Sequence, residues 1–332
     1  MICPNCVYQP SLKKYIEDNG KLTCCDYCKS HSVSVDDKSL SQFMLEKAHS
    51  VLVPSDCLSS YEQGMIFECG SDEPRVFELW EFFEDFPKWA IEGFMETFMD
   101  AIPRDVDSSG RPILYAVDDG YLDELNNFEN NWEKFQSSIN NTNRFFNNGA
   151  SKFLDELFAV LMVGSKFDRS VIHILDNEKP IYRARIAANK TTLKEIQSDP
   201  IKQLGPTPAH LASNQRMSPE GISVFYGALD RATCISEIRP LVGDTVISGE
   251  FRALTDLKLL DLNKLVNFKP NTDVFDDNYI QHAHATAFFK ELVFQMSRPA
   301  RRGRGNPYLS TQVIFEYLSV KFANQVDGIM YR

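Results

Sequence analysis

The sequence predicts an α+β protein made of consecutive parts. Two pairs of cysteines open the chain, apolar residues at helical spacing follow to about residue 165, and short β-rich runs alternate with helical stretches after that point. These observations predict zinc-ribbon-like knuckles over 1–32, a helical domain over 33–165, and a domain over 166–332 with a strongly bent mixed or antiparallel sheet. A length of 332 residues, 43% of them hydrophobic, suits about two or three domains.

The cysteine-rich start predicts a structural metal site. Four cysteines form two Cys-x2-Cys pairs with 18 residues between the pairs: Cys3, Cys6, Cys25 and Cys28. Such a pair lies on a tight knuckle that points both thiolates at one ion, so the set suits tetrahedral zinc. Because no coordination position stays open, we expect the zinc to stabilise the fold and not to act in catalysis. Cys24 and His31 are substitute ligands, and unmetallated thiols or a redox role are the alternatives.

The middle of the chain reads as a helical bundle rich in aromatic side chains. Segment 76–100 mixes acidic and large apolar residues, and segments 121–139 and 151–163 place apolar residues at helical spacing. Turn-forming residues gather at 101–112 and 140–151, which predicts loops there.

After residue 165 the pattern changes to strands and helices. Helices are expected at 279–297 and 311–324. Five β-rich runs are predicted as strands: SVIHIL (170–175), PIYRARI (180–186), SVFYGAL (223–229), DTVISGEFRAL (244–254) and KLLDL (258–262).

Charge and hydropathy exclude some classes of function. The 35 basic and 46 acidic residues give a net charge of −11, which disfavours broad binding to nucleic acid because phosphate backbones repel an acidic chain. No apolar run reaches roughly 18 residues, and the N-terminus lacks the apolar core of a signal peptide. We therefore expect a cytoplasmic protein with no membrane partner.

One block of the second half resembles a known family. LGPTPAHLASNQRMSPEGISVFYGALDRATCISEIRP (204–240) closely resembles the core signature of the RES domain, and IYRAR (181–185) and DGIMYR (327–332) resemble further RES elements. The cysteine pairs and the helical region resemble the HEPN/RES N-terminal domain that precedes some RES domains. Within the block, Asn214 and Gln215 depart from the small residue and glycine of many relatives, and the resemblance implies one more short strand after DGIMYR.

The resemblance implies a fold, an activity and a set of site residues. RES domains look like ADP-ribosyltransferases of the diphtheria-toxin type, and family members are toxins that degrade NAD by hydrolysis or phosphorolysis. This chain would then deplete NAD and arrest growth, in toxin–antitoxin or antiphage defence, under the control of an antitoxin or regulatory protein, and it could form a homo-oligomer. Carried over residue by residue, the family pattern falls on Arg183, Arg216, Tyr226 and Glu237, with Ser310 or Thr311 at the serine position and Tyr182 as a second stacking residue.

These residue types fit the chemistry of NAD. Arginine binds the two phosphates through its planar fork of donors, and tyrosine offers a flat face for nicotinamide. Cleavage of the nicotinamide–ribose bond builds positive charge on the ribose, which a carboxylate stabilises, so Glu237 takes the central catalytic role. The basic tract RPARRGRG (298–305) is interpreted as a solvated loop, with closure over the NAD phosphates as the alternative.

Three other functions stay open on the sequence. A protein ADP-ribosyltransferase would use the same NAD site, since the acceptor is not written in the NAD-binding residues. A zinc-ribbon binder or HEPN ribonuclease is disfavoured by the charge, and no histidine follows an arginine at the Arg-x4–6-His spacing of HEPN nucleases. The third reading is an interaction module without catalytic activity.

Overall fold

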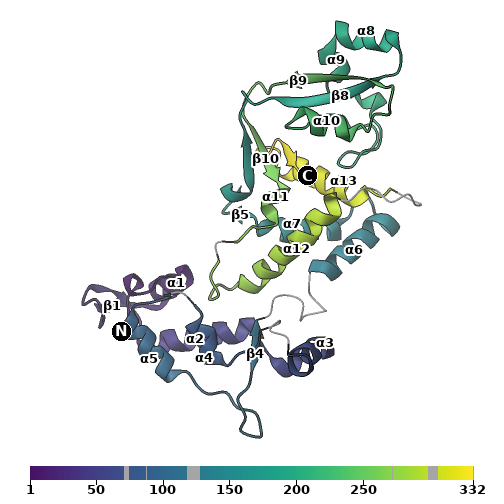
Figure 1. Ribbon diagram of the computed structural model, residues 1–332. Helices are drawn as coiled ribbons and strands as arrows, with labels where there is room; N and C mark the ends of the chain where they lie inside the picture. The colour runs from purple at the N-terminus through teal and green to yellow at the C-terminus, as the bar shows by residue number, and fades with distance from the viewer. Residues whose placement is uncertain (71–74, 87, 118–127, 271, 298–305, 332) are drawn as a thin grey trace. The chain divides into compact units, whose positions relative to one another are not determined.

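The structure is a computed structural model that forms two compact units (Figure 1). The first comprises Met1–Asn130 with Lys269–Phe288, and the second Asn131–Phe268 with Phe289–Arg332. The described residues are 1–70, 75–86, 88–117, 128–270, 272–297 and 306–331.

The first unit is built around the cysteine knuckles and an aromatic core. Trp89, Phe94 and Phe98 are at most 1% exposed, and the Trp89 ring meets each phenylalanine ring edge to face, with the centroids of Trp89 and Phe98 5.2 Å apart. The buried cysteines belong to the same core, so the knuckles and the helices after them fold together. Its elements are η1 (Pro4–Cys6), α1 (Pro10–Asn19), β1 (Lys21–Cys24), β2 (His31–Ser34), α2 (Asp37–Val51), β3 (Leu52–Pro54), η2 (Ser55–Cys57), α3 (Ser60–Gln63), the π-helix η3 (Gly64–Glu68), α4 (Leu79–Glu84), α5 (Glu92–Ala101) and β4 (Tyr115–Val117).

The helical prediction needs a correction at 76–100, which is not one helix. The segment forms α4 and α5 with an extended stretch between them. In that stretch Ala90 pairs with Val7 in a β-bridge, and the Ile91 amide donates to the Cys6 carbonyl at 3.0 Å. In this stretch, backbone pairing with the cysteine knuckle therefore takes the place of helical hydrogen bonds. The strands β3 and β4, which pair antiparallel, also lie inside the region read as helical.

The second unit confirms the predicted α+β class with a small mixed sheet. The central strand β10 pairs antiparallel with β7 and parallel with β11, and β8 and β9 form a separate antiparallel ribbon. Its elements are α6 (Phe128–Asn141), α7 (Asn148–Ala159), β5 (Met162–Val163), β6 (Lys166–Phe167), η4 (Arg169–Val171), β7 (Ile172–Leu175), β8 (Ile181–Ala187), α8 (Lys190–Ser198), α9 (Pro200–Leu204), η5 (Ala209–Leu211), α10 (Arg231–Glu237), β9 (Thr245–Phe251), β10 (Leu257–Asp261), α11 (Leu262–Leu265), α12 (Tyr279–Ser297), α13 (Leu309–Lys321) and β11 (Gly328–Met330).

The expected strand at 223–229 is the second correction. This segment makes a single β-bridge, between Ala228 and Tyr182, and is otherwise irregular. Gly227 already lies against β8, since a Cβ added to it would stand 2.4 Å from Cγ2 of Ile181. The hydroxyl of Tyr226 accepts a hydrogen bond from the Met217 amide at 3.1 Å, which draws the chain toward that loop and away from a ladder. The other four predicted strands and both predicted helices are confirmed with small shifts of their ends.

The β8–β9 ribbon carries helices on two sides. In Figure 1, α8 and α9 lie on one side of the ribbon and α10 lies on the other. Side chains from β8 and β9 pack with Ile196 of α8 and Leu204 of α9 in a small core. The ribbon thereby fixes α10, which carries Glu237, beside β8, which carries Arg183.

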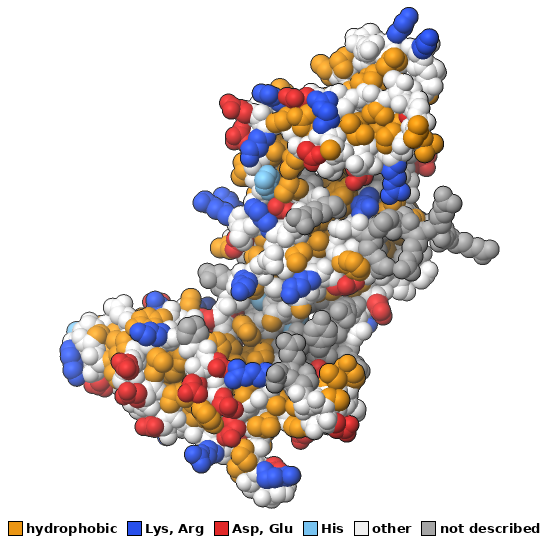
Figure 2. All heavy atoms as spheres, in the orientation of Figure 1, with side chains coloured by type: hydrophobic (Ala, Val, Ile, Leu, Met, Phe, Trp, Pro, Cys, Tyr) orange, Lys and Arg blue, Asp and Glu red, His pale blue; other side chains and the backbone are white. Residues whose placement is uncertain are grey.

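Two further features of the structure are the charges on its surface and the length and polarity of its helices. Both acidic and basic side chains lie on the face drawn in Figure 2. Within the described ranges, every helix is too short or too polar to cross a membrane.

Candidate functional site

Arg183 and Tyr182 lie next to each other on β8 and point to opposite faces of the ribbon. The Tyr182 ring stacks under the guanidinium of Arg231 from α10, 4.8 Å away. Arg183 stands over the ring of Phe225 at 5.3 Å, and its buried Nη1 has no hydrogen-bond partner. Burial, followed by the neighbouring Arg185, lowers the pKa of Arg183, while Cys234 and Tyr226 act in the opposite direction.

The loop before Tyr226 carries Arg216 and is held by α13. The buried side chain of Gln312 donates from Nε2 to the Asn214 side chain and the Gln215 carbonyl, both at 2.6 Å, and to the Ser218 carbonyl at 3.2 Å. Asn214 and Gln215, which depart from the family pattern, are thus two of the positions that anchor the loop. A small residue at 214 would lack the side-chain amide that Asn214 contributes, so that departure adds a contact in this chain, whereas Gln215 contributes a backbone carbonyl that glycine would also offer.

Thr311 and Ser310, the two options for the family serine, have different surroundings. The hydroxyl of Thr311 is buried and donates to the carbonyls of Arg216 and Tyr308. The hydroxyl of Ser310 accepts from the side chain of Gln136 on α6 at 3.4 Å. The structure therefore brings Thr311 to the Arg216 loop, where its hydroxyl holds backbone, and directs Ser310 toward α6.

Tyr226 is tied to the same loop through its hydroxyl. That hydroxyl accepts from the Met217 amide and shares a hydrogen bond with the Ser218 hydroxyl, both at 3.1 Å. Its ring position is therefore fixed relative to Arg216, and the neighbouring Phe225 lies against the guanidinium of Arg183. These contacts bring two predicted arginines and the predicted tyrosine into one region.

Glu237 is the last residue of α10, and its side chain is exposed. The helix begins where the Asp230 side chain accepts from the Thr233 amide at 2.8 Å. Glu237 lies near Tyr331, because its charge helps to raise the pKa of that tyrosine. Burial and Tyr226 are larger causes, Tyr308 adds to them, and Arg216 opposes them, with a resulting pKa of about 12.

Tyr331 therefore lies among Arg216, Tyr226 and Glu237, yet no sequence pattern singled it out as a site residue. The Arg216 guanidinium stands 5.7 Å from its ring centroid and 5.9 Å from that of Tyr308. Tyr331 does fall in DGIMYR, one of the segments that resemble RES elements. Tyr308 and Gln312 lie on either side of Ser310 and Thr311, the two options for the family serine. The resemblance thus includes the segments that carry Tyr308, Gln312 and Tyr331, but it did not single out these side chains.

Charge in this region favours an anionic ligand. Among the described residues, no Asp or Glu lies within ion-pair distance of Arg183 or Arg216. Arg216 instead donates from Nη1 to the Met296 carbonyl at 2.8 Å. Guanidinium groups without a carboxylate partner keep donors free for phosphate oxygens. The basic tract 298–305 lies outside the described residues.

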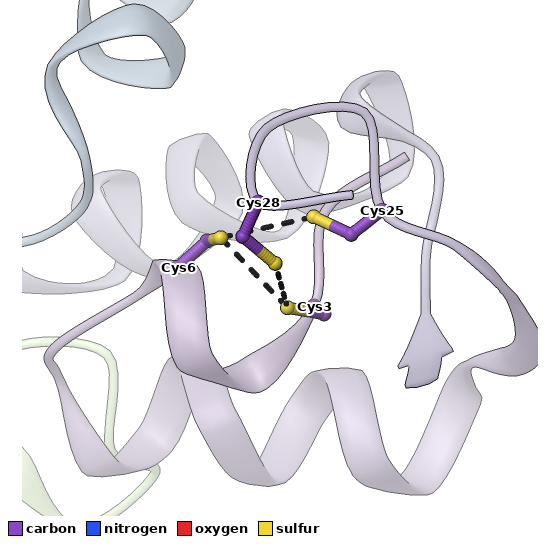
Figure 3. Close-up of side chains that lie close together, drawn as sticks. All are labelled: Cys3, Cys6, Cys25 and Cys28. Carbon is purple, nitrogen blue, oxygen red and sulfur yellow. Dashed lines mark hydrogen bonds between the residues drawn. The ribbon is translucent and has the colours of Figure 1, made fainter. Parts of the chain in front are cut away.

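The four predicted metal ligands come together in the first unit (Figure 3). Their sulfur atoms all lie within 4.8 Å of one another, and three pairs are 3.5–3.8 Å apart: Cys3 with Cys28, Cys6 with Cys25, and Cys3 with Cys6. Four thiolates at about 2.3 Å from one ion would form a tetrahedron with edges of about 3.8 Å, so the cluster could hold a metal ion.

The immediate surroundings of the cluster suit such a site. Hydrogen bonds from the Ser30 side chain and backbone lower the pKa of Cys28 to about 6, whereas burial raises that of Cys3. Lys29 adopts a left-handed backbone with φ 60°, which closes the second knuckle. The substitute ligands Cys24 and His31 face each other as an exposed cross-strand pair and are not part of the cluster.

Comparison with known proteins identifies one family. Residues 180–332 match the family described as RES domain, which includes every predicted site residue of the second unit. No curated protein and no solved structure matches the chain.

Proposed function

Residues 180–332 of this chain are a RES domain, and from this premise we propose that the domain binds NAD and breaks its nicotinamide–ribose bond. The observation that carries the proposal is a pair of arginines beside Tyr226, Arg183 and Arg216, which have no carboxylate partner among the residues that the structure describes. Nη1 of Arg183 is a buried donor with no hydrogen-bond partner, and an oxygen of the NAD diphosphate would satisfy it.

The remaining residues supply the rest of the reaction. The ring of Tyr226 stacks against nicotinamide, and the carboxylate of Glu237 stabilises the positive charge that develops on the ribose. The bond between the nicotinamide nitrogen and ribose C1′ breaks, and its electron pair leaves with neutral nicotinamide. An oxygen of water, phosphate or a protein side chain then bonds to C1′, and a water or phosphate acceptor loses its proton. Arg183 and Arg216 hold the diphosphate throughout.

NAD turnover by the purified chain, with and without phosphate, tests the proposal. Products are separated by chromatography, and Glu237→Gln is the control, since it keeps the size of the side chain and removes its charge. Nicotinamide release that disappears in the variant supports the reaction, and ADP-ribose or its phosphate would identify the acceptor. Label transferred to a protein would favour the ADP-ribosyltransferase alternative. Absence of NAD binding would refute the proposal and leave an interaction module.

For the first unit we propose a zinc ion held by Cys3, Cys6, Cys25 and Cys28. A closed four-thiolate set supplies folding energy and no catalytic position. The module then serves sensing, docking or dimerisation. Such a chain would deplete cytoplasmic NAD and arrest growth, which calls for an antitoxin or a trigger to restrain it. Growth arrest on expression that disappears with Glu237→Gln is the corresponding test in cells.

A further inference from the structure

Two tyrosines hold Arg216 from separate elements. Tyr308 precedes α13, where its amide donates to the Asn306 side chain at 3.0 Å. Tyr331 follows β11, whose parallel pairing with β10 sets Met330 opposite Asp261. The guanidinium of Arg216 lies within 6 Å of both ring centroids, at 5.9 and 5.7 Å. The β10–β11 pairing and the start of α13 therefore each place a tyrosine ring next to Arg216.

The chemistry of this arrangement differs from that of an ion pair. A carboxylate would orient Arg216 but would also compete with a phosphate for its N–H donors. An aromatic face attracts a guanidinium through its quadrupole and accepts none of the in-plane donors that phosphate requires. The Met296 carbonyl accepts from Nη1, so the other nitrogens of Arg216 stay available for an anionic ligand. The pKa of Tyr331, raised to about 12 mainly by burial, keeps that ring neutral at pH 7.

We propose that Tyr331, together with Tyr308, is a positioning residue that fixes the direction of the Arg216 guanidinium toward the diphosphate of NAD. The inference rests on the proposed function, because NAD supplies the diphosphate. It assigns the role to the ring of Tyr331 and not to its hydroxyl. Tyr331 acts through Arg216, so its loss is expected in the affinity for NAD more than in the rate of bond cleavage.

The test compares Tyr331→Phe, which keeps the ring, with Tyr331→Leu, which removes it. Calorimetric binding of ADP-ribose is measured with kcat and KM for nicotinamide release. We expect Tyr331→Leu to raise the Kd for ADP-ribose and the KM for NAD about 3- to 10-fold with a smaller change in kcat, and Tyr331→Phe to stay near wild type. Tyr61→Leu, at a 76% exposed tyrosine of the first unit, is the matched control.

Each other outcome decides against a defined part of the inference. A Phe variant as weak as the Leu variant, or a Leu variant with unchanged affinity, overturns the role of the ring. If Tyr331→Leu does not fold, Tyr308→Leu removes the other ring. Unchanged affinity of that variant for ADP-ribose overturns the proposed role of the two rings. A wild-type chain that binds ADP-ribose but releases no nicotinamide refutes the proposed reaction. The affinities of Tyr331→Phe and Tyr331→Leu for ADP-ribose still test the positioning role of the ring. A wild-type chain that binds neither NAD nor ADP-ribose overturns both.

Discussion

Replacing Arg183 by methionine should make the ligand-free protein more stable and weaken its binding of NAD. Nη1 of Arg183 is buried without a partner, and an unsatisfied buried donor costs about 1–3 kcal/mol. Methionine fills similar space without that donor but loses the contact of the guanidinium with Phe225, which contributes about 0.5–1 kcal/mol. The difference is a net stabilisation of about 0–2.5 kcal/mol, or a rise in melting temperature of up to about 10 °C for a unit of this size.

The same substitution removes a charge-assisted bond to phosphate, which contributes about 1.5–3 kcal/mol and corresponds to about 10- to 150-fold weaker binding. Differential scanning calorimetry measures the stability, and titration calorimetry with ADP-ribose measures the binding. Arg185→Met is the control, because that arginine is exposed on the same strand and bonds the Gln203 carbonyl at 3.0 Å. A lower melting temperature, or unchanged affinity, for Arg183→Met would refute the reasoning.

Three further predictions concern other residues. Glu237→Gln should lower kcat about 10²- to 10³-fold with little change in melting temperature, since the side chain is exposed; equal rates in turnover assays would contradict its role. Gln312→Met leaves the carbonyls of the Arg216 loop without their donor, so calorimetry should find the protein about 1–3 kcal/mol less stable and its binding of ADP-ribose weaker, whereas Gln136→Met should do neither. Cys6→Ser should lose bound zinc by elemental analysis and melt at a lower temperature, because Cys6 is 2% exposed within the core; a wild-type chain free of metal and indifferent to chelators would count against the site.

Local pattern predicted the parts of the fold that depend on local rules. Cysteine spacing identified the four clustered thiols, and β-rich runs identified four strands, since neighbouring residues determine both. The segment 223–229 fails this test because Gly227 and Tyr226 are fixed by contacts with β8 and with the 216–218 loop. The break in 76–100 likewise follows from pairing with Val7, more than 80 residues away in sequence.

The candidate site divides in the same way. A contiguous signature pointed to Arg216, Tyr226 and Glu237, which lie within 22 residues of one another. Tyr331 and Gln312 join them only through sheet pairing and side-chain hydrogen bonds across about 90 residues or more. No local pattern marks such residues, because a tyrosine or a glutamine in a helix or after a strand is ordinary in itself.

The anchoring of the Arg216 loop by Gln312 also has a consequence for the nascent chain. Gln312, the partner of Gln215 in α13, is the 97th residue after it in the chain. At translation rates of about 5–20 residues per second, the loop waits roughly 5–20 s for the residue that shapes it. Arg216, which would bind the NAD diphosphate, is thus synthesised well before Gln312, which anchors its loop. A nascent chain that does not yet include Gln312 therefore lacks the anchored loop.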